Sequence, residues 1–94
     1  MENQAHREEV QQLFVRHISP IKGFILGLCP DFSAADDILQ EVFMTVTRKA
    51  DDFEPGTNFP AWARAIARNK VLEYLKKSAR LACPLDEEAL DAVA

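Results

Sequence analysis

Residues 33–50 of the chain read SAADDILQEVFMTVTRKA, and the spacing within this stretch decides the fold. Its apolar side chains recur every three or four residues, as they do on one face of an α-helix. Ser33, with Asp36 three residues later, resembles a capping box, so we expect a helix from Ser33 to about Ala50. Five apolar residues share one arc of this helix and are predicted to lie in the core: Ile38, Leu39, Val42, Phe43 and Val46.

The opposite arc of the same helix is polar and mainly acidic. Its members are Asp37, Gln40, Glu41, Met44 and Arg48. These side chains are expected to be exposed, because the apolar arc takes up the buried face. Nothing around them predicts the desolvation that a catalytic carboxylate needs.

The stretch before this helix predicts another one. Apolar residues from Val10 to Leu28 keep a spacing of three and four, and the pattern stays in phase on both sides of Pro20. Since proline interrupts the hydrogen bonds of a helix interior, we predict one long helix that is kinked or restarted at Ser19 and Pro20. The sequence Cys-Pro-Asp at 29–31 ends it.

The stretch after it predicts a loop and a third helix. Residues 51–59 read DDFEPGTNF, and within them residues 54–57 have proline and glycine where a type II turn favours them. The following helix is capped by Asn58 or Phe59 and runs to about Ala79. No segment shows the alternation that is typical of a strand.

These elements predict an all-α fold, a compact bundle of about three main helices over residues 1–80. A chain of 94 residues leaves room for only one domain of this kind. Residues 81–94 are acidic and lack a core pattern, so we expect a linker or tail there.

The charge of the chain is divided between two parts. Its formal net charge is −4, which by itself argues against binding to a polyanion. Residues 61–80, however, carry six basic residues and one acidic residue, whereas the remainder carries five basic and fourteen acidic residues. Such asymmetry is typical of a protein with two surfaces for different partners, although a solvated helix face is a simpler interpretation.

The third predicted helix contains the parts of a surface for single-stranded nucleic acid. It has an aromatic residue, Trp62, near its start and basic residues along its length, and Phe53 and Phe59 lie in or beside the preceding loop. A structural interpretation stays open, because either phenylalanine can instead form an apolar contact across the start of the helix, known as a hydrophobic staple. Four apolar residues of the helix can equally anchor the core: Trp62, Ile66, Leu72 and Leu75.

The sequence contains no recognisable catalytic or metal-binding set, and no cofactor is expected. His6 and His17 have no third ligand, and Cys29 and Cys83 lie far apart, which favours reduced thiols. No apolar run approaches the roughly 20 residues that span a bilayer, so no membrane insertion is expected. The N-terminus lacks the basic and apolar regions of a signal peptide, which makes a cytoplasmic protein the default.

Four segments, in this order, carry a resemblance to a known family. They are residues 37–43 (DILQEVF), Phe53 with its Pro-Gly turn, residues 59–69 (FPAWARAIARN) and residues 74–77 (YLKK). Together they resemble conserved region 2 of the extracytoplasmic-function sigma factors of bacterial RNA polymerase. The resemblance covers about residues 10–80.

The resemblance implies two binding surfaces. The exposed face of the DILQEVF helix would dock on the clamp helices of the polymerase β′ subunit, through Asp37, Gln40, Glu41, Met44 and Arg48. The loop 53–60 and the third helix would bind and help melt the promoter −10 element, with one non-template base flipped from the stack. The residues implied in DNA binding are Phe53, Asn58, Phe59, Trp62, Arg68, Asn69, Lys70, Lys76 and Lys77. An anti-sigma factor that covers either surface would silence the protein.

Two features depart from the family pattern. Where the family shows Trp-Leu-Tyr-Arg-Ile, residues 62–66 read WARAI, so we expect a different promoter preference or melting power. No segment after Leu81 is long enough for the second, helix-turn-helix domain of a complete member, so we expect the chain to be an N-terminal domain. The alternative to a promoter-recognition function is a helical interaction module without a DNA function, which would share the same fold.

Overall fold

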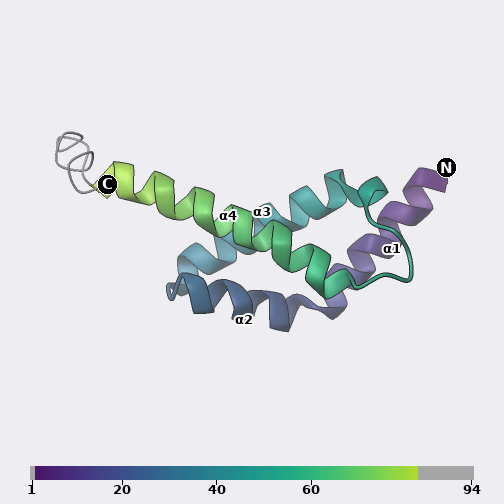
Figure 1. Cartoon of the computed structure of the whole chain (residues 1–94), viewed down its shortest axis with the longest axis horizontal. Coiled ribbons are helices and arrows are strands. Elements are labelled where there is room, and N and C mark those ends of the chain that lie inside the picture. Colours follow the sequence, from purple (N-terminus) through teal and green to yellow (C-terminus); the bar gives the residue numbers. More distant parts are fainter. Residues whose placement is uncertain (1, 83–94) are drawn as a thin grey trace.

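The computed structural model describes residues 2–82, and the regular elements in this part of the chain are all helical (Figure 1). They are α1 (Glu2–Arg16), α2 (Ile18–Leu28), α3 (Phe32–Arg48), the short 3-10 helix η1 (Ala50–Asp52) and α4 (Phe59–Ala82). The predicted all-α fold is confirmed, with α1 and α2 as the two parts of the first predicted helix. The predicted tail begins within the last turn of α4, and its residues 83–94 lie outside the described part.

The break between α1 and α2 falls at His17, two residues before the predicted position at Ser19 and Pro20. Pro20 lies in the first turn of α2, where its missing N–H is not needed by the helix. The chain therefore restarts its helix before the proline. The His17 N–H still donates to the carbonyl oxygen of Leu13 at 3.1 Å, and the Ile21 N–H donates to that of His17 at 3.1 Å.

The start of α3 also differs from the prediction. Asp31, and not Ser33, is the N-cap, because its Oδ1 accepts a hydrogen bond from the Ala34 N–H at 3.2 Å. An aspartate at this position satisfies one of the free N–H groups of the first turn. The capping residue thus lies two positions earlier, and Phe32 becomes the first residue of the helix.

α2 and α4 lie side by side and run in the same direction, and α3 packs against both in the opposite direction (Figure 1). α1 packs on α3 and η1. The His6 Nε2 lies 2.7 Å from the carbonyl oxygen of Ala50, and the Gln11 Nε2 donates to the Thr47 Oγ1 at 3.2 Å. A salt bridge of 3.0 Å between Lys22 and the residue Asp36 links α2 to α3.

The inner face of α3 is the centre of the core, as predicted. Ile38, Val42 and Val46 are buried, and Leu39 and Phe43 are half-buried and pack against them. Fully burying such a side chain contributes about 1.5–3 kcal/mol, so this face holds the domain together.

After Phe59, the inner face of α4 consists of small residues. Ala63, Ala67 and Val71, spaced four apart, are all fully buried. Short side chains at a helix contact allow the two helix axes to come closer together. Leu72 and Leu75, two of the four candidate core anchors, are instead 48% and 41% exposed, because they lie beside this inner face and not on it.

Candidate functional site

An aromatic cluster closes the loop between η1 and α4. The ring centroids of Phe53 and Phe59 are 5.3 Å apart in an edge-to-face arrangement, and Trp62 lies 5.2 Å from Phe53 and 5.8 Å from Phe59. Phe53 is 4% exposed and Phe59 is 3% exposed. The prediction that these two rings contact DNA bases therefore needs correction, because neither has a free face. The alternative role, stapling the helix entry, is the one observed.

The loop itself contains the predicted type II turn at residues 54–57. The Thr57 N–H donates to the Glu54 carbonyl oxygen at 3.2 Å, and Gly56 has a φ of +87°. Only glycine adopts this backbone conformation without a steric penalty. The Thr57 hydroxyl donates to the same carbonyl oxygen at 2.6 Å, which fixes the turn at the base of α4.

Asn58, which the resemblance assigns to DNA binding, has a structural role at the start of α4. Its Oδ1 accepts a hydrogen bond from the Ala61 N–H at 3.1 Å, so it caps the helix as the sequence predicts. The residue is exposed, and its amide nitrogen has no partner within the described residues.

Replacing Asn58 by alanine should lower the free energy of unfolding by about 1 kcal/mol, because the Ala61 N–H loses its acceptor. Asn58→Asp keeps a side-chain oxygen as the acceptor and should stay close to the wild-type stability. Chemical unfolding followed by circular dichroism measures both. A loss in Asn58→Asp as large as in Asn58→Ala would contradict the capping role.

Four of the predicted DNA-binding residues share the solvent-facing side of α4. Trp62 is half-buried, and its ring packs on the other rings of the aromatic cluster. Arg68, Asn69 and Lys76 are exposed. At 100° per residue, Asn69 and Lys76 lie close to Trp62 on the helix surface, whereas Arg68 lies about a third of a turn away. Among the described residues, Arg68 and Lys76 take part in no salt bridge. This side of α4 therefore carries free positive charge next to an aromatic ring.

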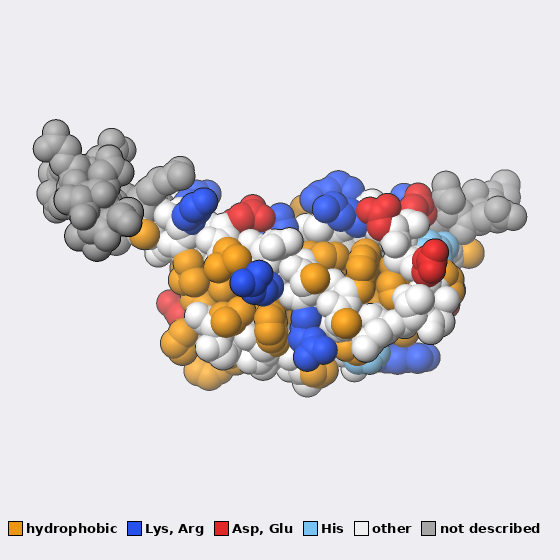
Figure 2. Space-filling view, viewed as in Figure 1, with side chains coloured by type: hydrophobic (Ala, Val, Ile, Leu, Met, Phe, Trp, Pro, Cys, Tyr) orange, Lys and Arg blue, Asp and Glu red, His pale blue; other side chains and the backbone are white. Residues whose placement is uncertain are grey.

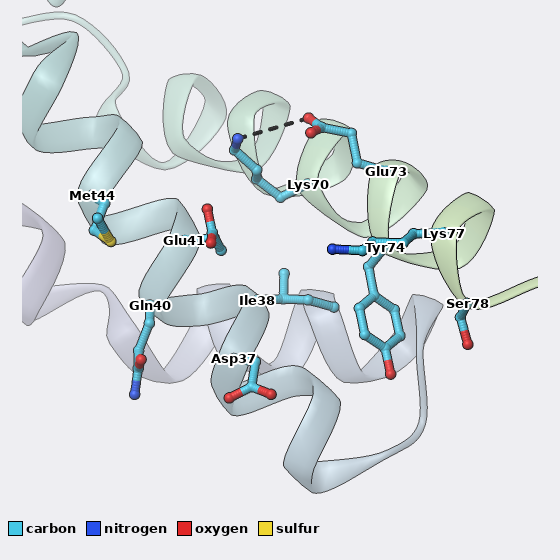
Figure 3. A pocket seen from close by; sticks show the side chains of 10 residues that line it. All are labelled: Asp37, Ile38, Gln40, Glu41, Met44, Lys70, Glu73, Tyr74, Lys77 and Ser78. Atoms are coloured by element: carbon cyan, nitrogen blue, oxygen red, sulfur yellow. Dashed lines mark ion pairs between the residues drawn. The ribbon is translucent and has the colours of Figure 1, made fainter. Parts of the chain in front are cut away.

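Lys70 and Lys77 lie elsewhere. They line a groove of about 550 Å³ between α3 and α4, together with Tyr74 (Figure 3). The Lys70 Nζ is 3.7 Å from the Glu73 carboxylate. The basic residues of α4 thus divide between two sides of the helix.

The other wall of this groove is the acidic face of α3. Asp37, Gln40, Glu41 and Met44 line it, and all four are exposed. Ile38 and Tyr74 project into the space between the helices, whereas Asp37 and Gln40 point away from α4 (Figure 3). Arg48 is exposed and lies one turn beyond Met44 on the same side of α3. The predicted polymerase-binding residues therefore form one continuous surface that extends to the groove.

The described residues contain no cluster of His, Cys, Asp or Glu that would hold a metal ion. Within residues 2–82, no helix is both long and apolar enough to cross a membrane.

Residues 13–81 match the family described as sigma-70 region 2. The chain belongs to this family. Sigma region 2 proteins are parts of transcription factors and not of enzymes.

Several curated sigma factors are similar to this sigma region 2 chain. CarQ of Myxococcus xanthus is 33% identical over 70 residues, which are 74% of this chain and 40% of CarQ. The extracytoplasmic-function sigma factor EcfG of Rhodopseudomonas palustris is 32% identical over 63 residues, 67% of this chain and 35% of EcfG. The extracytoplasmic-function sigma factor RpoE of Cereibacter sphaeroides is 33% identical over 75 residues. The chain thus spans about two fifths of the length of these relatives.

A solved structure has the same fold. It is an engineered region 2 of sigmaE in complex with GTAAAA, determined by NMR. The two structures agree with a TM-score of 0.67 at 26% sequence identity, over 85% of this chain and 92% of the other. The predicted resemblance to an extracytoplasmic-function sigma region 2 is confirmed by these relatives.

Proposed function

We propose that this sigma region 2 domain, residues 1–80, takes part in promoter recognition. It binds core RNA polymerase through the outer face of α3 and the single-stranded −10 element through α4. The observation that carries the proposal is the match of residues 13–81 to sigma-70 region 2, since both surfaces lie inside this segment. The domain is not an enzyme; the polymerase performs the chemistry, in the cytoplasm, and the domain supplies binding energy.

The partner of α3 is the pair of clamp helices of the β′ subunit. Support comes from the exposed row Gln40, Met44 and Arg48, spaced four apart on α3, with Asp37 and Glu41 beside it. Charge complementarity steers association and excludes wrong partners. The exposed Met44 offers an adaptable apolar contact within this polar surface.

The DNA surface is the solvent-facing side of α4, with Trp62, Arg68, Asn69 and Lys76. The similar region 2 of sigmaE in complex with GTAAAA supports nucleic-acid binding by this fold. Free cations hold phosphates, and Trp62, which is only half-buried, keeps part of its surface accessible to a base. Phe53 and Phe59 support this surface by packing beneath it, and Lys70 and Lys77, which line the groove beside α3, are left out of it.

Charge reversal at Arg68 and Lys76 should weaken binding of single-stranded DNA of sequence GTAAAA by at least about 10-fold at 0.1 M salt, because two phosphate contacts are lost. For a single strand, the slope of log K against log salt should also become shallower by about 1.4. Fluorescence anisotropy at several salt concentrations, starting at low ionic strength, measures both quantities.

The matched control is the double variant Arg7→Glu, Arg16→Glu, which changes the net charge equally on the exposed surface of α1. It should retain most of the affinity. Equal losses in the two double variants would contradict a DNA surface on α4 and would favour the interaction-module alternative. An anti-sigma factor would inhibit the domain by covering either surface.

A further inference from the structure

The outer face of the C-terminal half of α4 carries exposed apolar side chains that the proposed DNA surface does not use. Leu72 and Leu75 are 48% and 41% exposed, and neither lines the groove between α3 and α4. Hydrophobic side chains also gather over the C-terminal part of α2, beside this part of α4, where Leu28 is 44% exposed (Figure 2). Single exposed leucines are ordinary, whereas a group of them next to charge is typical of a contact surface.

Two basic side chains flank this apolar face. Arg68 and Lys76 lie four residues before and four residues after Leu72, so each is one helical turn away on the same side. Both are exposed, and within residues 2–82 neither takes part in a salt bridge. The chemical complement of this face is therefore a segment that combines leucines with carboxylates.

The chain has such a segment shortly after α4. Residues 85–91, here called the acidic segment, read LDEEALD and lie outside the described part of the chain. They contain two leucines, four carboxylates and no basic residue. Their charge is opposite to that of residues 61–80, which carry six basic residues and one acidic residue.

The position of the acidic segment in the chain allows it to return along the same helix. α4 ends at Ala82, and Pro84 follows two residues later, where proline favours the end of a helix. At a rise of 1.5 Å per residue, Leu75 lies about 10 Å and Arg68 about 21 Å back from Ala82 along the axis. Residues 85–91 can reach about 10–30 Å from Ala82, since an extended chain covers about 3.3 Å per residue.

We propose that the acidic segment docks on the outer face of α4. Its two leucines cover Leu72 and Leu75, and its carboxylates lie beside Arg68 and Lys76. A short tether gives a local concentration in the mM range, so this segment outcompetes the same segment of a second copy. Because Arg68 and Lys76 belong to the proposed DNA surface, the docked segment competes with DNA. This consequence, but not the docking itself, rests on the proposed function of α4.

The docking is tested without DNA, on the full chain of 94 residues. Proton–nitrogen correlation spectra compare the wild type with the double variant Leu85→Gln, Leu90→Gln, which removes apolar contacts and keeps every charge. The amide signals of residues 68–76 should shift, and those of α1 should not. The matched control is Val15→Gln, at a valine of α1 that is 61% exposed, and it should leave the signals of residues 68–76 in place.

Release of the acidic segment should also raise the affinity for single-stranded GTAAAA. Because apparent affinity scales with the fraction of protein competent to bind, a free fraction of roughly 0.1–0.3 predicts a rise of roughly 3- to 10-fold. The double variant Leu72→Gln, Leu75→Gln should give the same rise as Leu85→Gln, Leu90→Gln. Combining all four substitutions should add nothing, since both pairs open the same contact. Fluorescence anisotropy measures these affinities, and Val15→Gln should match the wild type.

Three results would overturn the docking. They are unchanged amide signals of residues 68–76 in Leu85→Gln, Leu90→Gln, spectral differences that vanish on dilution, which would assign the segment to a second copy, and additive affinity gains from the two pairs. Failure of the DNA function gives a different result. If the signals of residues 68–76 shift as expected but the folded wild type and its variants do not bind GTAAAA even at low salt, the DNA surface fails and the docking stands.

Discussion

Replacing Phe59 by alanine should lower the free energy of unfolding by about 3–5 kcal/mol, as truncation of a buried phenylalanine does. Phe59 is the centre of the aromatic cluster, because its ring packs on Phe53 and Trp62 and lies 5.6 Å from the ring of His17. A small domain has a total stability of only about 5–15 kcal/mol. The melting temperature should therefore fall by more than about 10 °C.

The matched control is Phe32→Ala. Phe32 is 74% exposed, so its truncation should change the stability by no more than about 0.5 kcal/mol. Thermal and urea unfolding of both variants provide the comparison. If Phe59→Ala were as stable as Phe32→Ala and lost only DNA affinity, the Phe59 ring would be a DNA contact and not a part of the core.

Reversing the charge at Asp37 and Glu41 should abolish capture of core RNA polymerase by this domain. Both side chains lie on the outer face of α3 and are exposed, so the variant should fold normally. Loss of complementary charge within an interface costs about 2 kcal/mol or more, which corresponds to a loss in affinity of about 30-fold or more. A pull-down of purified core polymerase by the tagged domain measures this, with helicity verified by circular dichroism.

The double variant Glu8→Lys, Glu9→Lys serves as control, because it makes the same change in net charge at exposed positions of α1. It should capture the polymerase as the wild type does. Capture by the Asp37→Lys, Glu41→Lys variant would move the docking surface away from α3. A folded wild type that captures no polymerase at low salt would remove the docking proposal itself.

Much of the fold is readable from the sequence where large apolar residues alternate with charged ones. α3 is the clearest case, because Ile38, Val42 and Val46 define one face so strongly that the exposure of Asp37 and Glu41 follows from the spacing. The turn before α4 is equally readable, since proline followed by glycine favours one turn type.

The sequence is less informative where small residues decide the packing. After Phe59, the buried face of α4 is made of two alanines and one valine. These give a weak hydrophobic pattern, so Leu72 and Leu75 compete as core candidates although they are exposed.

The buried alanines of α4 also determine where related sequences are free to diverge. At Ala63 and Ala67 any larger side chain must push α4 away from its neighbours, so substitution there is expected to be tolerated poorly. The outer positions of the same helix, such as Ala65 and Leu72, carry no such restriction. In a library that replaces each residue of α4 by every other amino acid, the number of tolerated substitutions should therefore rise and fall with the helical period. A helix of this kind can acquire a new nucleotide preference on its outer side while its scaffold stays unchanged.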